Sequence, residues 1–183
     1  EAKDLGIKTP SGKINKVIYK GIEPKASVHL VFSGDYVYDR ANTNQLDALA
    51  SVLTIKLTER LREDESGVYG VGASVICDKY PQGHYSFNVS FDCGPENVEK
   101  LIASTLDEIN KIKQNGAQEA DVQKFFAEQK RTTEIQLKEN NFWLGYLSGQ
   151  LQNKEDARAI LTHLQSLKMV SSESLKAAAN TYV

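Results

Sequence analysis

Polar and apolar side chains alternate along two short stretches near the start of the chain. Residues 13–21 and 26–34 both combine a period of two with β-rich composition, and Glu23 and Pro24 between them supply a turn. These features are typical of strands. We therefore predict two sheet strands that follow one another directly.

A second pair of alternating stretches, residues 70–78 and 84–92, flanks the segment KYPQG, in which Pro81 and Gly83 suit a turn. Successive side chains of a strand point to opposite faces of its sheet. In residues 84–92 one face carries Tyr85, Phe87, Val89 and Phe91, and the other carries His84, Ser86, Asn88 and Ser90. We predict a β-hairpin with one face in the core and one polar face.

Elsewhere apolar residues recur every three or four positions, which indicates helices. The first helix begins near Asn42, and the second begins at Pro95, because proline is favoured in a first helical turn. Their buried stripes are Leu46, Leu49, Ala50, Leu53, Leu57 and Leu61, and Val98, Leu101, Ile102, Thr105, Ile109 and Ile112. We predict a third helix over residues 118–139 and shorter helical pieces after it, the last with Ser171 as its N-cap.

The order of these elements determines the expected fold class. Strands and a helix come first, then strands, then a run of helices, which differs from the regular alternation of a parallel sheet. We predict an α+β, two-layer sandwich with a mostly antiparallel sheet packed by helices. The 183 residues, 40% of them hydrophobic, are enough for one core. We therefore predict a single domain over residues 1–183.

Charge and hydropathy exclude several kinds of partner. The 22 basic and 24 acidic side chains give a net charge of −2, without the basic block that a nucleic-acid-binding arm needs. No apolar run reaches the roughly 18 residues of a membrane span. The chain starts at Glu1 without a leader-like segment, which we interpret as the sign of a processed or partial chain.

Cysteines and histidines give no sign of a metal site. The predicted hairpin places Cys77 opposite a residue near Tyr85 and not opposite Cys93, so two separate buried thiols are expected. His29, His84 and His163 lie far apart, and neither H-x-x-E-H nor H-E-x-x-H occurs. We predict no zinc site in this chain.

The glycine-rich and acidic segments between the first helix and the hairpin give weak signals. GVYGVG, residues 67–72, follows a helix and precedes a strand, whereas a dinucleotide-binding loop needs the reverse order. The acidic run before the glycines has two interpretations, an acid/base pair of carboxylates or a solvated charge run at a helix end. It consists of Glu59, Glu63, Asp64 and Glu65. Charge runs of this kind are usually solvated, which favours the second interpretation.

One segment carries a resemblance to a known family. In LREDESGVYGVGAS, Arg62 precedes Tyr69 by seven positions after a long helix, which resembles the arginine-and-tyrosine segment in the C-terminal half of pitrilysin/insulysin-type zinc peptidases. Four other segments match in order: GIEPKASVHLVFSG, NQLDALASVLTIKLTERLRE, ENNFWLGYLSGQL and SSESLKAAANTYV. The resemblance thus covers nearly the whole chain.

The resemblance implies a metallopeptidase-domain (LuxS/processing-peptidase-like) fold and a C-terminal domain that lacks the zinc site. Zinc, held by H-x-x-E-H and a distant glutamate, would belong to an N-terminal domain of the same polypeptide, and the domains would close around a peptide substrate. Arg62 and Tyr69 would fix the carbonyls of that peptide and stabilise the oxyanion. Gly67, Gly70 and Gly72 would let its backbone approach closely. A bacterial parent would be compatible with a periplasmic or other extracytoplasmic location.

Other interpretations stay open. Arg62 is also suited to capping the helix C-terminus, and Tyr69 to packing as a strand aromatic. Phe142, Trp143 and Tyr146 at helical spacing suit the core, a contact with a neighbouring domain, or a pocket for a peptide side chain. Instead of completing a protease, the chain would serve as an inactive structural or assembly subunit of the same fold or as a free-standing peptide-binding module.

Overall fold

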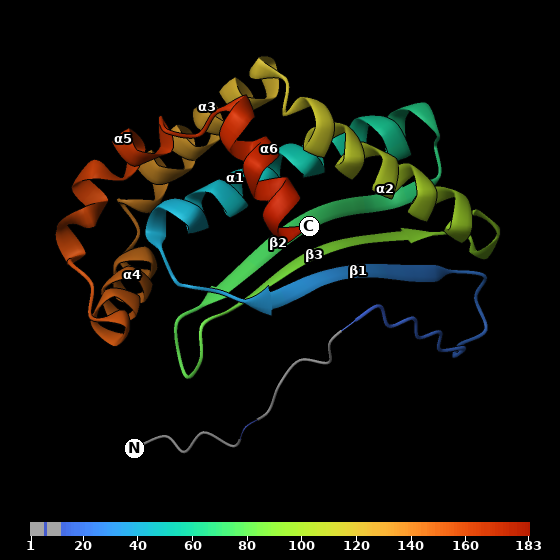
Figure 1. Cartoon of the computed structure of the whole chain (residues 1–183), viewed down its shortest axis with the longest axis horizontal. Coiled ribbons are helices and arrows are strands. Elements are labelled where there is room, and N and C mark those ends of the chain that lie inside the picture. The colour runs from blue at the N-terminus through green and yellow to red at the C-terminus, as the bar shows by residue number, and fades with distance from the viewer. Residues whose placement is uncertain (1–5, 7–11) are drawn as a thin grey trace.

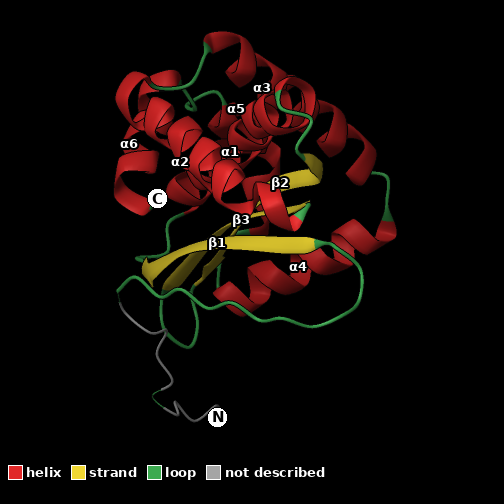
Figure 2. Ribbon diagram, turned by 90° about the vertical axis from the view of Figure 1, so that its right-hand side faces the viewer, coloured by secondary structure: helices red, strands yellow, loops and turns green. Residues whose placement is uncertain are grey.

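The computed structural model describes residue 6 and residues 12–183. Helices gather on one face of a small sheet, while α4 lies apart from that group (Figures 1 and 2). The strands are β1 (Ala26–Asp35), β2 (Val68–Asp78) and β3 (His84–Cys93). The helices are α1 (Arg40–Leu57), the π-helix η1 (Thr58–Asp64), the 3-10 turn η2 (Pro95–Asn97), α2 (Val98–Asn115), α3 (Glu119–Gln136), α4 (Asn140–Asn153), the 3-10 segment η3 (Ala157–Thr162), α5 (His163–Leu167) and α6 (Ser172–Tyr182).

The sheet has the order β1-β3-β2, and both pairs of neighbours are antiparallel. Cys77 lies opposite Tyr85, as predicted from the hairpin, and both cysteines are free thiols. Cys93 is buried as expected, whereas Cys77 is only partly buried. Phe87, Val89 and Phe91 of the central strand are at most 3% exposed, because the helices cover this face. The predicted α+β, two-layer fold and the apolar face of β3 are therefore confirmed.

The long first helix supplies much of the core. Its predicted leucine stripe is confirmed, since Leu46, Leu49, Leu53, Leu57 and Leu61 are all at most 2% exposed. The same helix also covers the outer edge of β2, where the hydroxyl of Thr54 accepts a hydrogen bond from the Ala73 backbone N–H at 2.9 Å. A covered edge is protected from pairing with another strand.

The strand predicted over residues 13–21 is wrong. In the structure this segment has no regular hydrogen bonding, and its large apolar side chains are exposed: Ile14 64%, Val17 65%, Ile18 73% and Tyr19 93%. A β-rich composition favours a strand only where a neighbouring strand and a packed face receive it. In the described part of the chain nothing pairs with the outer edge of β1.

The helix boundaries follow the predicted signals with small shifts. Pro95 opens a 3-10 turn, and α2 itself starts at Val98. Ser171 is the N-cap of α6: its hydroxyl accepts from the Ser174 N–H, and the Ser174 hydroxyl accepts from the Ser171 N–H. The first helix does not end at Leu57 but continues as a π-helix to Asp64. This continuation places the candidate site.

Candidate functional site at the helix–strand junction

The candidate site is the turn between the π-helix and β2, residues 58–72, which we call the helix–strand junction. The turn closes with wide hydrogen bonds: Glu65 N–H donates to the Arg60 carbonyl at 3.1 Å, and Gly67 N–H donates to the Leu61 carbonyl at 2.9 Å. Ser66 between them adopts a left-handed conformation with φ 49°. π-Helical turns and left-handed non-glycine residues are both concentrated at functional sites.

Tyr69 occupies a bulge at the start of β2. Val68 lies opposite Cys93 and Gly70 lies opposite Asp92, so Tyr69 is an extra residue without its own partner on β3. A bulge of this kind redirects a side chain. The side chain of Tyr69 is 75% exposed, and it makes no hydrogen bond to another described residue. The alternative that Tyr69 packs as a buried strand aromatic does not describe this position.

Arg62 precedes Tyr69 by seven positions and lies on the exposed side of the π-helix. No ion pair or hydrogen bond joins its guanidinium to another described residue. Its neighbour Arg60 is fully engaged, with Nε 2.8 Å from Glu65 and Nη1 3.1 Å from Glu108. Arg60 is thus used in contacts within the domain, whereas the guanidinium of Arg62 has no partner among the described residues.

Glu65 holds the junction against α2. Its carboxylate accepts from Arg60 Nε at 2.8 Å and from the Ser104 hydroxyl at 2.8 Å, and Lys100 Nζ lies at 3.0 Å. Burial raises the pKa of Glu65, but the hydrogen bonds from Arg60 and Ser104 and the nearby charge of Lys100 outweigh it and lower the pKa to about 2. Glu65 is therefore ionised at neutral pH.

The interpretation of the acidic run as a solvated face is wrong for Glu65, whose side chain is only 12% exposed. Glu65 does not suit the alternative role of general base either, because its low pKa makes it a weak one. The sequence missed this anchor because its partners Lys100 and Ser104 lie on another helix. Their spacing of four residues on α2 was the available signal.

The three glycines of the junction occupy two different environments. Gly67 lies against α2: a Cβ added there would be 2.7 Å from Leu101 Cδ2, so this glycine permits close packing. Gly70 and Gly72 would meet nothing within 4 Å, and their partners Asp92 and Ser90 belong to the uncovered face of β3. The space that a peptide backbone would need is present at Gly70 and Gly72, whereas Leu101 occupies it at Gly67.

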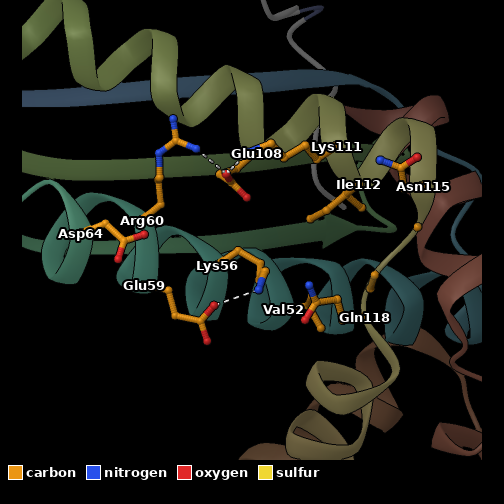
Figure 3. A pocket seen from close by; sticks show the side chains of 12 residues that line it. Val52, Lys56, Glu59, Arg60, Asp64, Glu108, Lys111, Ile112, Asn115 and Gln118 are labelled. Carbon is orange, nitrogen blue, oxygen red and sulfur yellow. Dashed lines mark hydrogen bonds and ion pairs between the residues drawn. The ribbon is translucent and has the colours of Figure 1, made fainter.

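A groove of about 400 Å³ lies behind the junction, between α1 with its π-helix and α2 (Figure 3). Most of its charges are paired within the groove: Lys56 lies 2.8 Å from Glu59, and Arg60 and Lys111 both contact Glu108. Neither Arg62 nor Tyr69 lines it. The groove offers no histidine, cysteine or hydroxyl group for catalysis, and we do not assign the site to it.

Metal-binding groups do not come together in the described part of the chain. No three His, Cys, Asp or Glu side chains among residues 6 and 12–183 are placed so that they could hold a metal ion. His29 lies opposite Ser90, while His84 is at the other end of the sheet beside Asp35. In the same residues no helix has both the length and the apolar character of a membrane span.

Phe142, Trp143 and Tyr146 form an aromatic cluster within α4. The rings of Phe142 and Tyr146 stack at 5.8 Å, and Trp143 meets both edge-on. All three side chains are partly exposed, so they are not part of the closed core. The expected contact with a neighbouring domain stays a prediction.

Comparisons with known proteins give a consistent assignment. Residues 1–128 match the family model described as peptidase M16 inactive domain. The chain is 32% identical over 108 residues to a probable zinc protease, PqqL, of Haemophilus influenzae, a match that covers 58% of this chain and 11% of that protein.

The fold is also found in solved structures of other proteins. The periplasmic protease PqqL from Escherichia coli has a TM-score of 0.74 and 23% identity, covering 88% of this chain and 18% of that one. A peptidase M16 inactive domain from Pseudomonas fluorescens has a TM-score of 0.75 and 16% identity, covering 87% of this chain and 38% of that one. The chain spans only about a tenth of the length of the curated relatives that it matches.

Proposed function

Because the chain belongs to the peptidase M16 family, as an inactive domain, we propose that its 183 residues form one non-catalytic domain of a longer zinc protease. In this proposal the domain completes the chamber that holds the peptide substrate. It contributes donors to the substrate, and the other domains of the same polypeptide contribute the hydrolytic machinery.

One observation carries the proposal: two strong donors, Arg62 and Tyr69, are exposed and have no partner among the described residues, although the turn that carries them is fixed. Glu65 binds the turn to Ser104 and Lys100 of α2 and to Arg60 within the turn, and Gly67 packs on Leu101. A donor held in place before the substrate binds loses little entropy on binding.

The chemistry of the two donors fits a peptide backbone. The guanidinium of Arg62 presents several N–H groups in a planar fork, and the phenol of Tyr69 presents one O–H. Both groups donate to a carbonyl oxygen, and such bonds strengthen when negative charge develops on that oxygen. We therefore assign to Arg62 and Tyr69 the fixation of a substrate carbonyl and support of its oxyanion.

The residues described here do not fit a zinc ion, because they provide no group of three metal ligands. The zinc implied by the zinc-protease relatives is therefore proposed to be held by another part of the polypeptide. The role of this domain in the reaction is limited to binding and orienting the substrate.

Kinetics of the full-length polypeptide test the assignment. With a quenched-fluorescent peptide library as substrate, Tyr69→Phe and Arg62→Ala should each lower kcat by about 10²–10³ without loss of zinc, since each removes one donor used in the reacting complex. Tyr80→Phe is the matched control for the hydroxyl, because Tyr80 is exposed in the hairpin turn. Glu63→Ala is the control for the exposed side of the π-helix.

Unchanged turnover in the Tyr69→Phe enzyme would refute the role of the phenol. For Arg62, a fall in melting temperature that accounts for the lost activity would show a structural role instead. A full-length polypeptide without peptidase activity would favour the assembly-subunit alternative.

A further inference from the structure

Helix α4 differs in composition from the other α-helices of more than five residues. Its 14 residues, NNFWLGYLSGQLQN, include no charged side chain, although 25% of the residues of the whole chain are charged. Leu144, Leu147 and Leu151 are exposed by 70%, 48% and 82%. They follow one another at intervals of three and four, so they form one continuous stripe on the helix, here called the leucine stripe.

The opposite side of α4 is attached to its own domain by polar contacts. Arg40 Nη2 donates to Gln150 at 2.8 Å and also to Glu155 at 2.8 Å. The Tyr146 hydroxyl donates to the Ala157 carbonyl at 2.9 Å, and Lys79 Nζ donates to the Asn153 carbonyl at 2.7 Å. These contacts fix the rotation of the helix, so the leucine stripe faces away from the domain as a consequence of the fold.

The leucine stripe departs from the usual pattern of a surface helix. A helix on the outside of a protein normally turns its apolar side to the core and its polar side to water. In α4, the buried Gln150 and its partner Arg40 lie on the inner side, and leucines lie on the outer side. A helix that is apolar on its outer side is typical of a position between two packed units.

The shape of the outer side suits a second helix. Gly145 and Ser148 lie beside the leucines and are exposed, and a Cβ added at Gly145 would meet nothing within 4 Å. Leucine side chains thus form a ridge next to positions with small side chains. Ridges at intervals of three and four residues pack into the matching grooves of another helix.

We propose that the leucine stripe is the docking surface for an apolar helix from another domain of the same polypeptide. The length of the relatives supports this occupant: the chain covers 11% of the Haemophilus influenzae protein and 18% of the Escherichia coli one. The inference rests on the proposed function in one respect: it requires that the chain is part of a longer polypeptide.

The size of the stripe argues against a second copy of the chain. Dividing the transfer free energy of a leucine side chain by the free energy per unit of apolar area gives the area of one side chain. On this basis the three partly exposed leucines present on the order of 200 Å² of apolar surface. A stable interface between separate proteins needs about 800 Å² on each partner. Domains of one polypeptide meet at a high effective concentration, so a smaller surface is sufficient for them.

Carbene footprinting tests the docking surface. The 183-residue chain, which has its own closed core, and the full polypeptide are labelled under the same conditions, and labelling is measured on the peptide that contains the leucine stripe. We expect labelling to be several-fold lower in the full polypeptide. Sedimentation velocity should show the 183-residue chain as a monomer.

A bump variant makes the test specific. Gly145→Leu adds a large side chain beside the leucine stripe but has space within the domain and improves helix propensity, so it should not destabilise α4 itself. In the full polypeptide it should restore the labelling of the stripe. Ala177→Leu introduces the same side chain at an exposed position of α6 and should leave the labelling unchanged.

Two results would overturn the proposal. Equal labelling of the wild-type stripe in the chain and in the full polypeptide would show that no other domain covers it. A dimer of the 183-residue chain with a protected stripe would assign the surface to a second copy. Either result is independent of the Tyr69→Phe kinetics, so the proposed function is tested separately.

Discussion

Replacement of Glu65 by glutamine should destabilise the domain, because it removes the charge that binds the helix–strand junction to α2. Interactions with Arg60, Ser104 and Lys100 lower the pKa of Glu65 from 4.5 to about 2 in the folded protein. A change of this size in the pKa corresponds to about 3 kcal/mol of folding free energy. Arg60 is 33% exposed and Lys100 63% exposed, so solvent screening reduces the expected loss to about 1–3 kcal/mol.

The pH dependence of this loss has a definite sign. The folded-state pKa is below the unfolded-state value, so the contribution of Glu65 is fully present above about pH 4.5 and disappears as the pH falls toward 2. Urea denaturation of wild type and Glu65→Gln should therefore differ most near pH 7. The difference should shrink steadily below pH 4.5.

Glu63→Gln is the matched control, because Glu63 is an exposed neighbour on the same turn with no partner among the described residues. Its denaturation midpoint should match that of wild type. Equal midpoints for Glu65→Gln and Glu63→Gln at pH 7 would refute the anchoring role of Glu65. So would a difference between Glu65→Gln and wild type that is independent of pH.

Further predictions concern packing, capping and metal. Gly67→Ala should destabilise the chain by about 1–2 kcal/mol through its clash with Leu101, whereas Gly70→Ala should stay within about 0.5 kcal/mol in urea titrations. Equal effects would contradict the packing role. Ser171→Ala should cost about 1 kcal/mol, because it removes the N-cap acceptor of the Ser174 N–H; an unchanged thermal melt would argue otherwise. Chelated and zinc-reloaded chain should retain no stoichiometric zinc by metal analysis, and one tightly bound ion per chain would overturn that expectation.

Much of the fold was readable in the sequence because it depends on local periodicity. The buried leucines of α1 follow from the spacing of neighbouring residues. So do the hairpin register that separates Cys77 from Cys93 and the Ser171 cap. The segment at residues 13–21 was mispredicted because its strand-like composition says nothing about whether a partner strand receives it. Contacts between distant segments decide such cases.

The candidate site was only partly readable for the same reason. Arg62 and Tyr69 were found through a familiar spacing, but the bulge that turns Tyr69 outward depends on the register against Cys93 and Asp92. The role of Glu65 depends on Lys100 and Ser104, which lie 35 and 39 residues further along the chain. A charge run gives no indication of which member will find a buried partner.

Site-specific photo-crosslinking tests the central claim most directly. The photoreactive residue p-benzoylphenylalanine is placed at position 69 or, as a control, at the exposed hairpin position 80 of the full-length polypeptide. After removal of metal to prevent cleavage, the protein is irradiated with a biotinylated peptide library. The proposed function predicts a crosslink at position 69 that excess unlabelled peptide suppresses, with little at position 80. Equal crosslinking at both positions, or none at position 69, would contradict the claim that this domain holds the substrate peptide at the helix–strand junction.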